Sequence, residues 1–257
     1  MKASEAIIKC LIEEKVNTVF GYPGGAIVSV YEALRRSKIH HVLVRHEQGA
    51  AHSASGYARV SGKTGVCITT SGPGATNLIT GIASAYMDSI PLVVITGQVR
   101  SDMIGRDMFQ EADITGATES FTKHSYLVKD ANELPRIMKE AFYIAATGRP
   151  GPVLIDVPSD IQDARIDFVY PEWVDIRGYK PTLKGHIGQI KKAAKAIAES
   201  ERPLIVAGGG VTLSHAEPEL LSFVEKTRIP AAHTLMGKGA LPSRNAHYVG
   251  MIGTHGF

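Results

Sequence analysis

Three short turns carry the side chains of this sequence that are best suited to chemistry. Each turn follows an apolar run and precedes a segment with helical periodicity, and the second contains a carboxylate, Glu47. Turns that follow neighbouring parallel strands meet at one edge of the sheet, where α/β proteins bind ligands. The pattern predicts a cleft lined by glycines, an amide and one carboxylate. The turns are Gly21-Tyr22-Pro23-Gly24-Gly25, Arg45-His46-Glu47-Gln48-Gly49-Ala50-Ala51 and Ser71-Gly72-Pro73-Gly74-Ala75-Thr76-Asn77.

Each turn also has a plain structural explanation. A helix dipole favours negative charge at its N-terminus, which accounts for Glu47 without any ligand. The third turn lies where a dinucleotide fingerprint would lie, but Asn77 stands at the position of the third glycine, so that match is weak. The N–H groups at its helix start would still favour an anionic or polar ligand. Convergence of all three turns on one edge is what favours a functional site.

Regularly alternating elements position these turns within residues 1–157. Short apolar runs, typical of strands buried on both faces, alternate with segments of helical period. We therefore expect an α/β fold with a doubly wound parallel sheet, and Ser4 is expected to cap the first helix. The expected strands are 18–20, 42–44, 65–70, 92–96 and 153–157, and the clearest helices are 26–36, 48–60, 75–86 and 133–146.

A second, smaller domain is expected after a linker. Residues 158–184 are polar and punctuated by proline and glycine, which is typical of a surface linker. Residues 185–257 contain two helical segments but only two strand-like runs, which would leave an exposed sheet edge. The chain is therefore expected to be truncated inside this domain. Its expected helices are 186–199 and 217–226, and its strand-like runs are 203–207 and 231–234.

Composition narrows the classes of function. Among 257 residues, 44% are hydrophobic and 21% charged, as in globular proteins with an ordinary core. A net charge of +3 without a basic run predicts no nucleic-acid partner. Cys10 and Cys67 lie in apolar segments and are interpreted as small buried residues. With no signal peptide and no apolar stretch long enough for a membrane, a cytoplasmic protein is expected, or an organellar one if a targeting peptide was removed.

Several kinds of catalytic site are disfavoured. The histidines His46, His52 and His124 are too scattered for a metal cluster, and no His-x-x-x-His or Cys-x-x-Cys spacing occurs, so no metal site is expected in this chain. The sequence also lacks a Gly-x-Ser-x-Gly elbow and a Walker-type lysine loop, which argues against hydrolases and P-loop enzymes.

The three turns resemble the pyrimidine-binding domain of thiamine-diphosphate enzymes, in order and spacing as well as in residues. Further segments are similar to acetolactate synthase, the enzyme of isoleucine, valine and leucine biosynthesis, and to the flavin-binding middle domain of its biosynthetic form. The resemblance covers essentially the whole chain. The further segments are Thr96-Gly97-Gln98-Val99, Phe109-Gln110-Glu111, Gly148-Arg149-Pro150-Gly151-Pro152-Val153, Ala207-Gly208-Gly209-Gly210 and Thr234-Leu235-Met236-Gly237-Lys238-Gly239.

The resemblance implies a reaction and a set of residues. Pyruvate would be decarboxylated on thiamine diphosphate, and the hydroxyethyl group would be joined to a second 2-oxo acid, pyruvate or 2-oxobutyrate. Glu47 would contact the aminopyrimidine ring and promote loss of the thiazolium C2 proton, with Gly25 and Gln110 completing the catalytic set. Lys123 would lie near the substrate channel. The cofactor cleft would be lined by Tyr22, Pro23, Gly24, Thr70 and Asn77.

The resemblance also implies FAD and partner subunits. Ile252 stands where the family commonly has histidine, which puts that flavin contact in question. The family's diphosphate and Mg²⁺ motif belongs to a third domain that does not occur in these residues, so an incomplete, inactive fragment is expected. A homodimer and a small regulatory subunit are the expected partners. The implied FAD contacts are Arg149, Gly208, Gly209, Thr234, Leu235, Met236, Val249, Gly250, Met251 and Ile252.

Two other hypotheses stay open from the sequence. A related thiamine-diphosphate decarboxylase or oxidase would keep the cofactor and change the acceptor. A naturally short, non-catalytic binding subunit would make no product. The preference between pyruvate and 2-oxobutyrate and the identity of any feedback inhibitor are not encoded in a recognisable motif.

Overall fold

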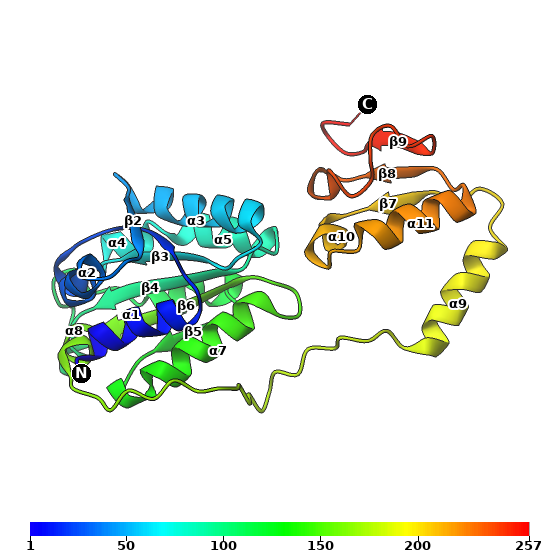
Figure 1. The fold of residues 1–257 in the computed structure, drawn as a ribbon. Coiled ribbons are helices and arrows are strands. Elements are labelled where there is room, and N and C mark those ends of the chain that lie inside the picture. Colours follow the sequence, from blue (N-terminus) through cyan, green and yellow to red (C-terminus); the bar gives the residue numbers. More distant parts are fainter. Residues whose placement is uncertain (257) are drawn as a thin grey trace. The chain divides into compact units, whose positions relative to one another are not determined.

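A computed structural model describes residues 1–256, and Phe257, the last residue of the expected middle domain, lies outside the described residues. The chain divides into two compact units, Met1–Thr182 and a second that begins at Leu183 (Figure 1). Within residues 1–256, no helix is long and apolar enough to cross a membrane.

The first unit is built on a six-stranded sheet of order β2-β1-β3-β4-β6-β5. Every neighbouring pair is parallel, which confirms the predicted α/β fold. Strands β3, β4 and β6 are buried at every residue, as expected for strands covered on both faces. The strands are β1 Thr18–Tyr22, β2 His40–Leu43, β3 Gly65–Thr69, β4 Leu92–Gln98, β5 His124–Leu127 and β6 Pro152–Pro158.

Helices cover both faces of this sheet (Figure 1). On one face, Ile68 and Ile95 pack in a core with residues of α1, α2 and α7. On the other face, Cys67 and Val94 pack with residues of α3 and α5. Alternate strand residues thus enter opposite cores. The helices are α1 Ala3–Glu13, η1 Gly25–Ile27, α2 Val28–Arg35, α3 Glu47–Ser61, α4 Pro73–Thr76, α5 Ile79–Met87, η2 Ser101–Met103, α6 Ile114–Thr118, η3 Glu119–Phe121, η4 Ala131–Glu133, α7 Leu134–Ala146 and α8 Ser159–Asp163.

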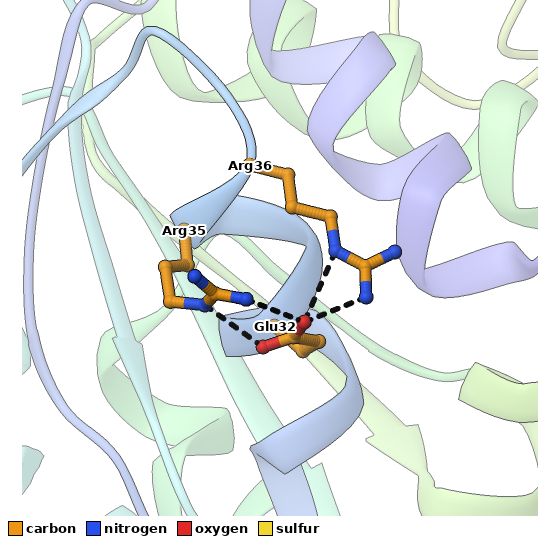
Figure 2. Close-up of polar contacts among 3 residues, drawn as sticks. All are labelled: Glu32, Arg35 and Arg36. Atoms are coloured by element: carbon orange, nitrogen blue, oxygen red, sulfur yellow. Dashed lines mark hydrogen bonds and ion pairs between the residues drawn. The ribbon is translucent and has the colours of Figure 1, made fainter.

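At the C-terminal end of α2, one carboxylate, that of Glu32, binds the guanidinium groups of Arg35 and Arg36, as Figure 2 shows. Glu32 Oε1 accepts from Arg35 Nη2 at 2.9 Å and from Arg36 Nη2 at 2.7 Å. Hydrogen bonds from Arg35 and then Arg36 lower the pKa of Glu32 to about 2. Both pairs are exposed, so they fasten the helix end locally and add little to global stability.

Several predicted boundaries in the first unit were wrong. The first helix begins at Ala3, so Ser4 is a buried residue of the first turn rather than its cap. The predicted helix 75–86 is two helices, α4 and α5, separated at Asn77 and Leu78. Strand β5 was not predicted because its sequence, His-Ser-Tyr-Leu, is half polar. It lies at the edge of the sheet, where polar side chains can reach solvent.

Residues 158–182, predicted as most of the linker, belong to the first unit. Their first part forms α8 and extends β6 by one residue, and Ile166 then exchanges backbone hydrogen bonds with Met1 at 3.0 and 2.9 Å. Tyr170 and Tyr179 pack against the core of the first unit. The prolines that suggest a linker therefore punctuate an extended strap whose aromatic side chains anchor it.

The second unit contains a three-stranded parallel sheet of order β7-β8-β9. The sequence predicted the first two strands but not β9, where the register shifts between Ala231 and Ala232 and Gly250 has φ of 104°. Val224, Ala231 and Leu241 form its small core. Its elements are α9 Ile187–Ala198, β7 Ile205–Ala207, α10 Gly209–Leu213, α11 Glu217–Thr227, β8 Ala231–His233, η5 Leu235–Gly237 and β9 Tyr248–Met251.

Few polar side chains are buried in the first sheet. Among them, the carboxyl group of Asp156 in β6 loses the most solvation on burial. Its side chain is 1% exposed, with Oδ1 accepting from Thr96 Oγ1 at 2.6 Å and Oδ2 accepting from Gln98 Nε2 at 2.9 Å. Burial raises the pKa of Asp156 to about 7, because desolvation outweighs these two hydrogen bonds.

This raised pKa predicts a measurable dependence of stability on pH. An unfolded aspartate titrates near pH 4, so between about pH 4 and pH 7 the folded protein keeps a proton that the unfolded chain releases, and stability falls as pH rises. Asp156→Asn removes that titration. Relative to wild type, its free energy of unfolding should rise by up to about 4 kcal/mol from pH 4 to pH 8 in urea titrations. Asp175→Asn, at an exposed aspartate, is the control; a flat difference for Asp156→Asn contradicts the prediction.

Two glycines of the first unit should respond oppositely to alanine. A Cβ at Gly21 would lie 2.2 Å from the Ile68 backbone oxygen and 2.2 Å from the Tyr31 hydroxyl. Gly21→Ala should therefore destabilise the fold by about 1–3 kcal/mol. Gly56, exposed inside α3, has nothing within 4 Å of its added Cβ, so Gly56→Ala should stabilise by about 0.5–1 kcal/mol. Denaturant unfolding of both variants tests the pair; equal shifts would contradict it.

Candidate functional site

The three turns singled out from the sequence lie at the carboxyl edge of the first sheet. Strand β1 lies between β2 and β3, with Gly21 opposite Leu43 and Tyr22 opposite Thr69. The last residues of the three strands are therefore side by side. Each strand is followed by one of the three predicted turns, so the turns converge on this edge.

Glu47 and Asn77 form the polar centre of this edge. Glu47 is the first residue of α3 and is half-buried, and its Oε2 accepts a hydrogen bond from Asn77 Nδ2 at 2.9 Å. Asn77 follows α4, in the turn after β3. His46 caps α3 by accepting from the Gln48 N–H at 3.2 Å. The two side chains thus come from separate turns and fix one another, which leaves a carboxylate of defined orientation at the edge.

Thr70 is the side chain around which the glycines pack. It is buried, and its Oγ1 accepts from the Ala26 N–H at 3.2 Å. A Cβ at Gly24 or at Gly74 would lie 2.6 Å from the Thr70 side chain. Gly24 is therefore required by contact of the first turn with Thr70, and Gly74 by contact with Thr70 within the segment that follows β3, whether or not a ligand is present. Sequence reasoning left Gly74 out of the site, although its place in a Gly-Pro-Gly turn was a usable signal.

Gly25, Tyr22 and Pro23 are on the open side of the same edge. All three are exposed, and a Cβ at Gly25 would meet nothing within 4 Å. The backbone there is accessible to an approaching group. Gly25 therefore differs from Gly24, whose missing side chain is explained by Thr70.

Gln110 reaches the third turn from the segment that follows β4. A Cβ at Gly72 would lie 2.5 Å from the Gln110 backbone oxygen, so the two backbones are in close contact. Gln110 has a positive φ of 59°, and neighbouring Phe109 is 85% exposed. The carboxylate of Glu111 accepts from the Gly105 and Met108 N–H groups, which lowers its pKa and closes the loop tip.

Lys123 and Arg149 are not brought to this edge. Lys123 immediately precedes β5, and its N–H donates to Pro152 at the start of β6, so it lies at the amino edge of the sheet. Its Nζ donates to the Thr147 backbone oxygen at 2.7 Å, to the Tyr179 hydroxyl at 2.8 Å and to the Ile144 backbone oxygen.

Arg149 likewise caps the end of α5. Its Nε donates to Ser89 Oγ at 2.7 Å, and its Nη2 donates to the backbone oxygens of Tyr86 and Met87 at 3.2 Å. The guanidinium also lies over the Tyr86 ring. Both cations therefore donate to the ends of helices where they lie.

The second unit has its own carboxyl edge, which collects the other predicted residues. Ala207, His233 and Met251 end the three strands in register. Gly208 and Gly209 follow β7 at the start of α10, and Thr234 follows β8, capping η5 by accepting from the Gly237 N–H at 3.2 Å. A Cβ at Gly209 would lie 3.1 Å from Met236 Cβ, so the two turns are packed together.

The remaining predicted residues of the second unit lie on or beside this edge. Val249, Gly250 and Met251 belong to β9, and the Ile252 N–H donates to the His233 oxygen at 2.9 Å. Leu235, Val249 and Ile252 are exposed. Throughout residues 1–256, no three His, Cys, Asp or Glu side chains form a group that could hold a metal ion.

Comparison with known proteins relates both units to one family of enzymes. Residues 1–117 match the family described as "Thiamine pyrophosphate enzyme, N-terminal TPP binding domain", and residues 190–257 match "Thiamine pyrophosphate enzyme, central domain". Over its whole length the chain is 55% identical to a probable acetolactate synthase large subunit of Methanocaldococcus jannaschii. It is 51% and 50% identical to acetolactate synthase large subunits of Corynebacterium glutamicum and Buchnera aphidicola.

The chain spans less than half the length of these relatives: 44%, 41% and 45% of them, respectively. The two matches lie in different units of the fold, residues 1–117 within the first and residues 190–257 within the second. The chain therefore belongs to the thiamine pyrophosphate enzymes, and it carries their N-terminal and central domains.

Proposed function

We propose that this chain is the pyrimidine-binding and central part of an acetolactate synthase large subunit. The complete protein would decarboxylate pyruvate and join the remaining two-carbon unit to a second 2-oxo acid, pyruvate or 2-oxobutyrate. The observation that carries the proposal is the hydrogen-bonded Glu47–Asn77 pair at the carboxyl edge of the sheet. The names of relatives at about half identity support this choice among thiamine pyrophosphate enzymes.

The residues at this edge fit the aminopyrimidine half of thiamine diphosphate. A carboxyl group held by one amide can share a proton with a ring nitrogen, and the backbone at Gly25 is open to an approaching group at the same edge. The bound cofactor supplies the electron sink for decarboxylation. Tyr22 and Pro23 would shield one side of the ring, and Gln110 would border the reacting groups.

Glu47 and Asn77 divide the work at this edge. Glu47 would deliver a proton to the pyrimidine ring nitrogen and take it back, which is general acid–base catalysis by a positioned carboxyl group. Asn77 would hold the carboxylate in one orientation, because its Nδ2 is bound to Oε2, while Oε1 lies beside Gly74, which has no side chain to cover it. We propose that the ligand contacts this second oxygen.

The diphosphate group and Mg²⁺ require other residues. The described part of this chain offers no acidic cluster for the metal, so no step of the reaction is assigned to Mg²⁺ here. We propose that a third domain of the complete protein binds both, in a homodimer in which the cofactor lies between subunits. A small regulatory subunit and a cytoplasmic location complete the proposal.

FAD is proposed as the ligand of the second unit. Its carboxyl edge joins a glycine turn, Gly208 and Gly209, to the Thr234 turn. Glycine turns at the carboxyl ends of parallel strands let a nucleotide approach the backbone. Leu235, Met236 and Ile252 would cover apolar parts of the ligand, since each is exposed at this edge.

The first test replaces the carboxylate by its neutral isostere. Glu47→Gln keeps the size of the side chain but cannot take up a proton, so acetolactate formation per active site should fall at least about 100-fold in the complete protein. Glu32→Gln, at an exposed glutamate of α2, is the matched control and should leave the rate unchanged. Undiminished acetolactate formation by Glu47→Gln would contradict the assignment.

A second test asks whether FAD binding depends on the second unit and is independent of the catalytic Glu47. Gly209→Val should weaken FAD binding about tenfold or more, because its side chain would displace the η5 turn at Met236. Glu47→Gln should bind FAD as wild type does, since Glu47 is not among the residues proposed to contact FAD. Titration followed by flavin absorbance measures both. Wild-type FAD affinity in a folded Gly209→Val protein would argue against this edge.

A further inference from the structure

Residues 99–113 form the connection that brings Gln110 to the third turn. At the contact, Gly72 has φ of +55° and Gln110 has φ of 59°, and the two backbones leave no room for a Cβ on Gly72. A non-glycine residue adopts positive φ only where its surroundings hold it there. The place of Gln110 therefore depends on what fixes this connection.

Two anchors hold the beginning and the tip of the connection. Near its start, the Ser101 N–H and hydroxyl donate to the Asp160 carboxylate at 2.8 and 2.5 Å. At the tip, Glu111 accepts from Gly105 and Met108. Both anchors are exposed to solvent, and neither ties the returning end of the connection to the sheet.

The returning end is held by a buried amide. Gln98, the last residue of β4, is 4% exposed, and one Nε2 proton is donated to the Ala112 backbone oxygen at 2.9 Å. The other is donated to Asp156 Oδ2 at 2.9 Å, while Gln98 Oε1 accepts from the Val99 N–H. Every polar group of the amide is used, so its orientation is fixed from three sides.

We propose that Gln98 and Asp156 are positioning residues of the site: Asp156 orients the Gln98 amide, and Gln98 holds Ala112 and thereby keeps Gln110 against Gly72. This inference rests on the proposed function, in which Gln110 borders the reacting groups. Neither residue touches substrate. Their effect on catalysis would pass entirely through the backbone of residues 110–112.

The energetic cost of Asp156 supports a role beyond packing. Its neighbours in β6, Ile155 and Val157, are apolar and fully buried, and a carboxylate among them loses solvation that two hydrogen bonds only partly replace. An apolar residue would suit the strand better. An apolar residue, however, could not accept the second hydrogen bond from Gln98 Nε2. Without that hydrogen bond, the amide of Gln98 could rotate away from Ala112.

The test compares variants of the complete protein that each remove a different hydrogen bond among Thr96, Gln98, Ala112 and Asp156. Gln98→Met keeps the length of the side chain but removes the donor to Ala112. The amides of residues 100–112 should then exchange with deuterium about tenfold faster, and kcat/KM for pyruvate should fall about tenfold, with amides of residues 93–95 unchanged as proof of folding. If Gln98→Met does not fold, Gln98→Asn serves, because its amide is one methylene too short to reach Ala112.

Two controls leave the critical bond in place. Thr96→Val removes the hydrogen bond to Asp156 Oδ1 and spares the Gln98–Ala112 bond. Asp156→Asn can still accept from Gln98 and can donate to Thr96. Both variants should retain the exchange protection of residues 100–112. Loss of protection in Thr96→Val equal to that in Gln98→Met would overturn the inference, since it would reflect general loosening of the sheet.

The readouts distinguish this inference from the proposed function. Unchanged exchange in Gln98→Met would overturn it directly. Faster exchange with an unchanged kcat/KM would also overturn it, while leaving the synthase assignment in place. If wild-type protein makes no acetolactate, the proposed function fails, and deuterium exchange still decides whether Gln98 holds the connection.

Discussion

Burial of the central strands on both faces is the constraint on which the rest of the first unit depends. Strands β3, β4 and β6 expose no residue, so each connection must carry a helix across one face before the next parallel strand begins. All strands then start at one edge and end at the other. The turns that follow Tyr22, Leu43 and Thr69 therefore all lie at the same edge of the sheet.

The two edges of this sheet consequently have different chemistry. The carboxyl edge gathers strand-to-helix turns, where glycines pack on Thr70 and a helix begins with Glu47. The amino edge gathers helix ends, whose last carbonyl groups need donors. Lys123 and Arg149 supply these donors. The resemblance places Lys123 near the substrate channel and Arg149 at FAD, and the direction of the chain explains why both cations also face backbone oxygens.

The sequence was most informative where structure depends on local pattern. Apolar runs and glycine turns predicted the parallel sheet and the convergence of Glu47 with Asn77. It was least informative where pairing is non-local: β5 and β9 are short and partly polar, and the strap after α8 is held by residues at the start of the chain. The Gln98–Asp156 bond depends on the register of β4 with β6, which no local pattern encodes.

Strand pairing also fixes the backbone at Ile252, the position where the related enzymes commonly have histidine. Met251 ends β9 opposite His233, and the Ile252 N–H donates to the His233 oxygen. The backbone at residue 252 is therefore fixed at the carboxyl edge by sheet pairing, whatever side chain it bears. Isoleucine in place of the family's histidine changes the group presented there from a polar ring to an apolar one. A ligand of this edge would lose one polar contact, but the glycine and threonine turns that define the edge would stay where the strands put them.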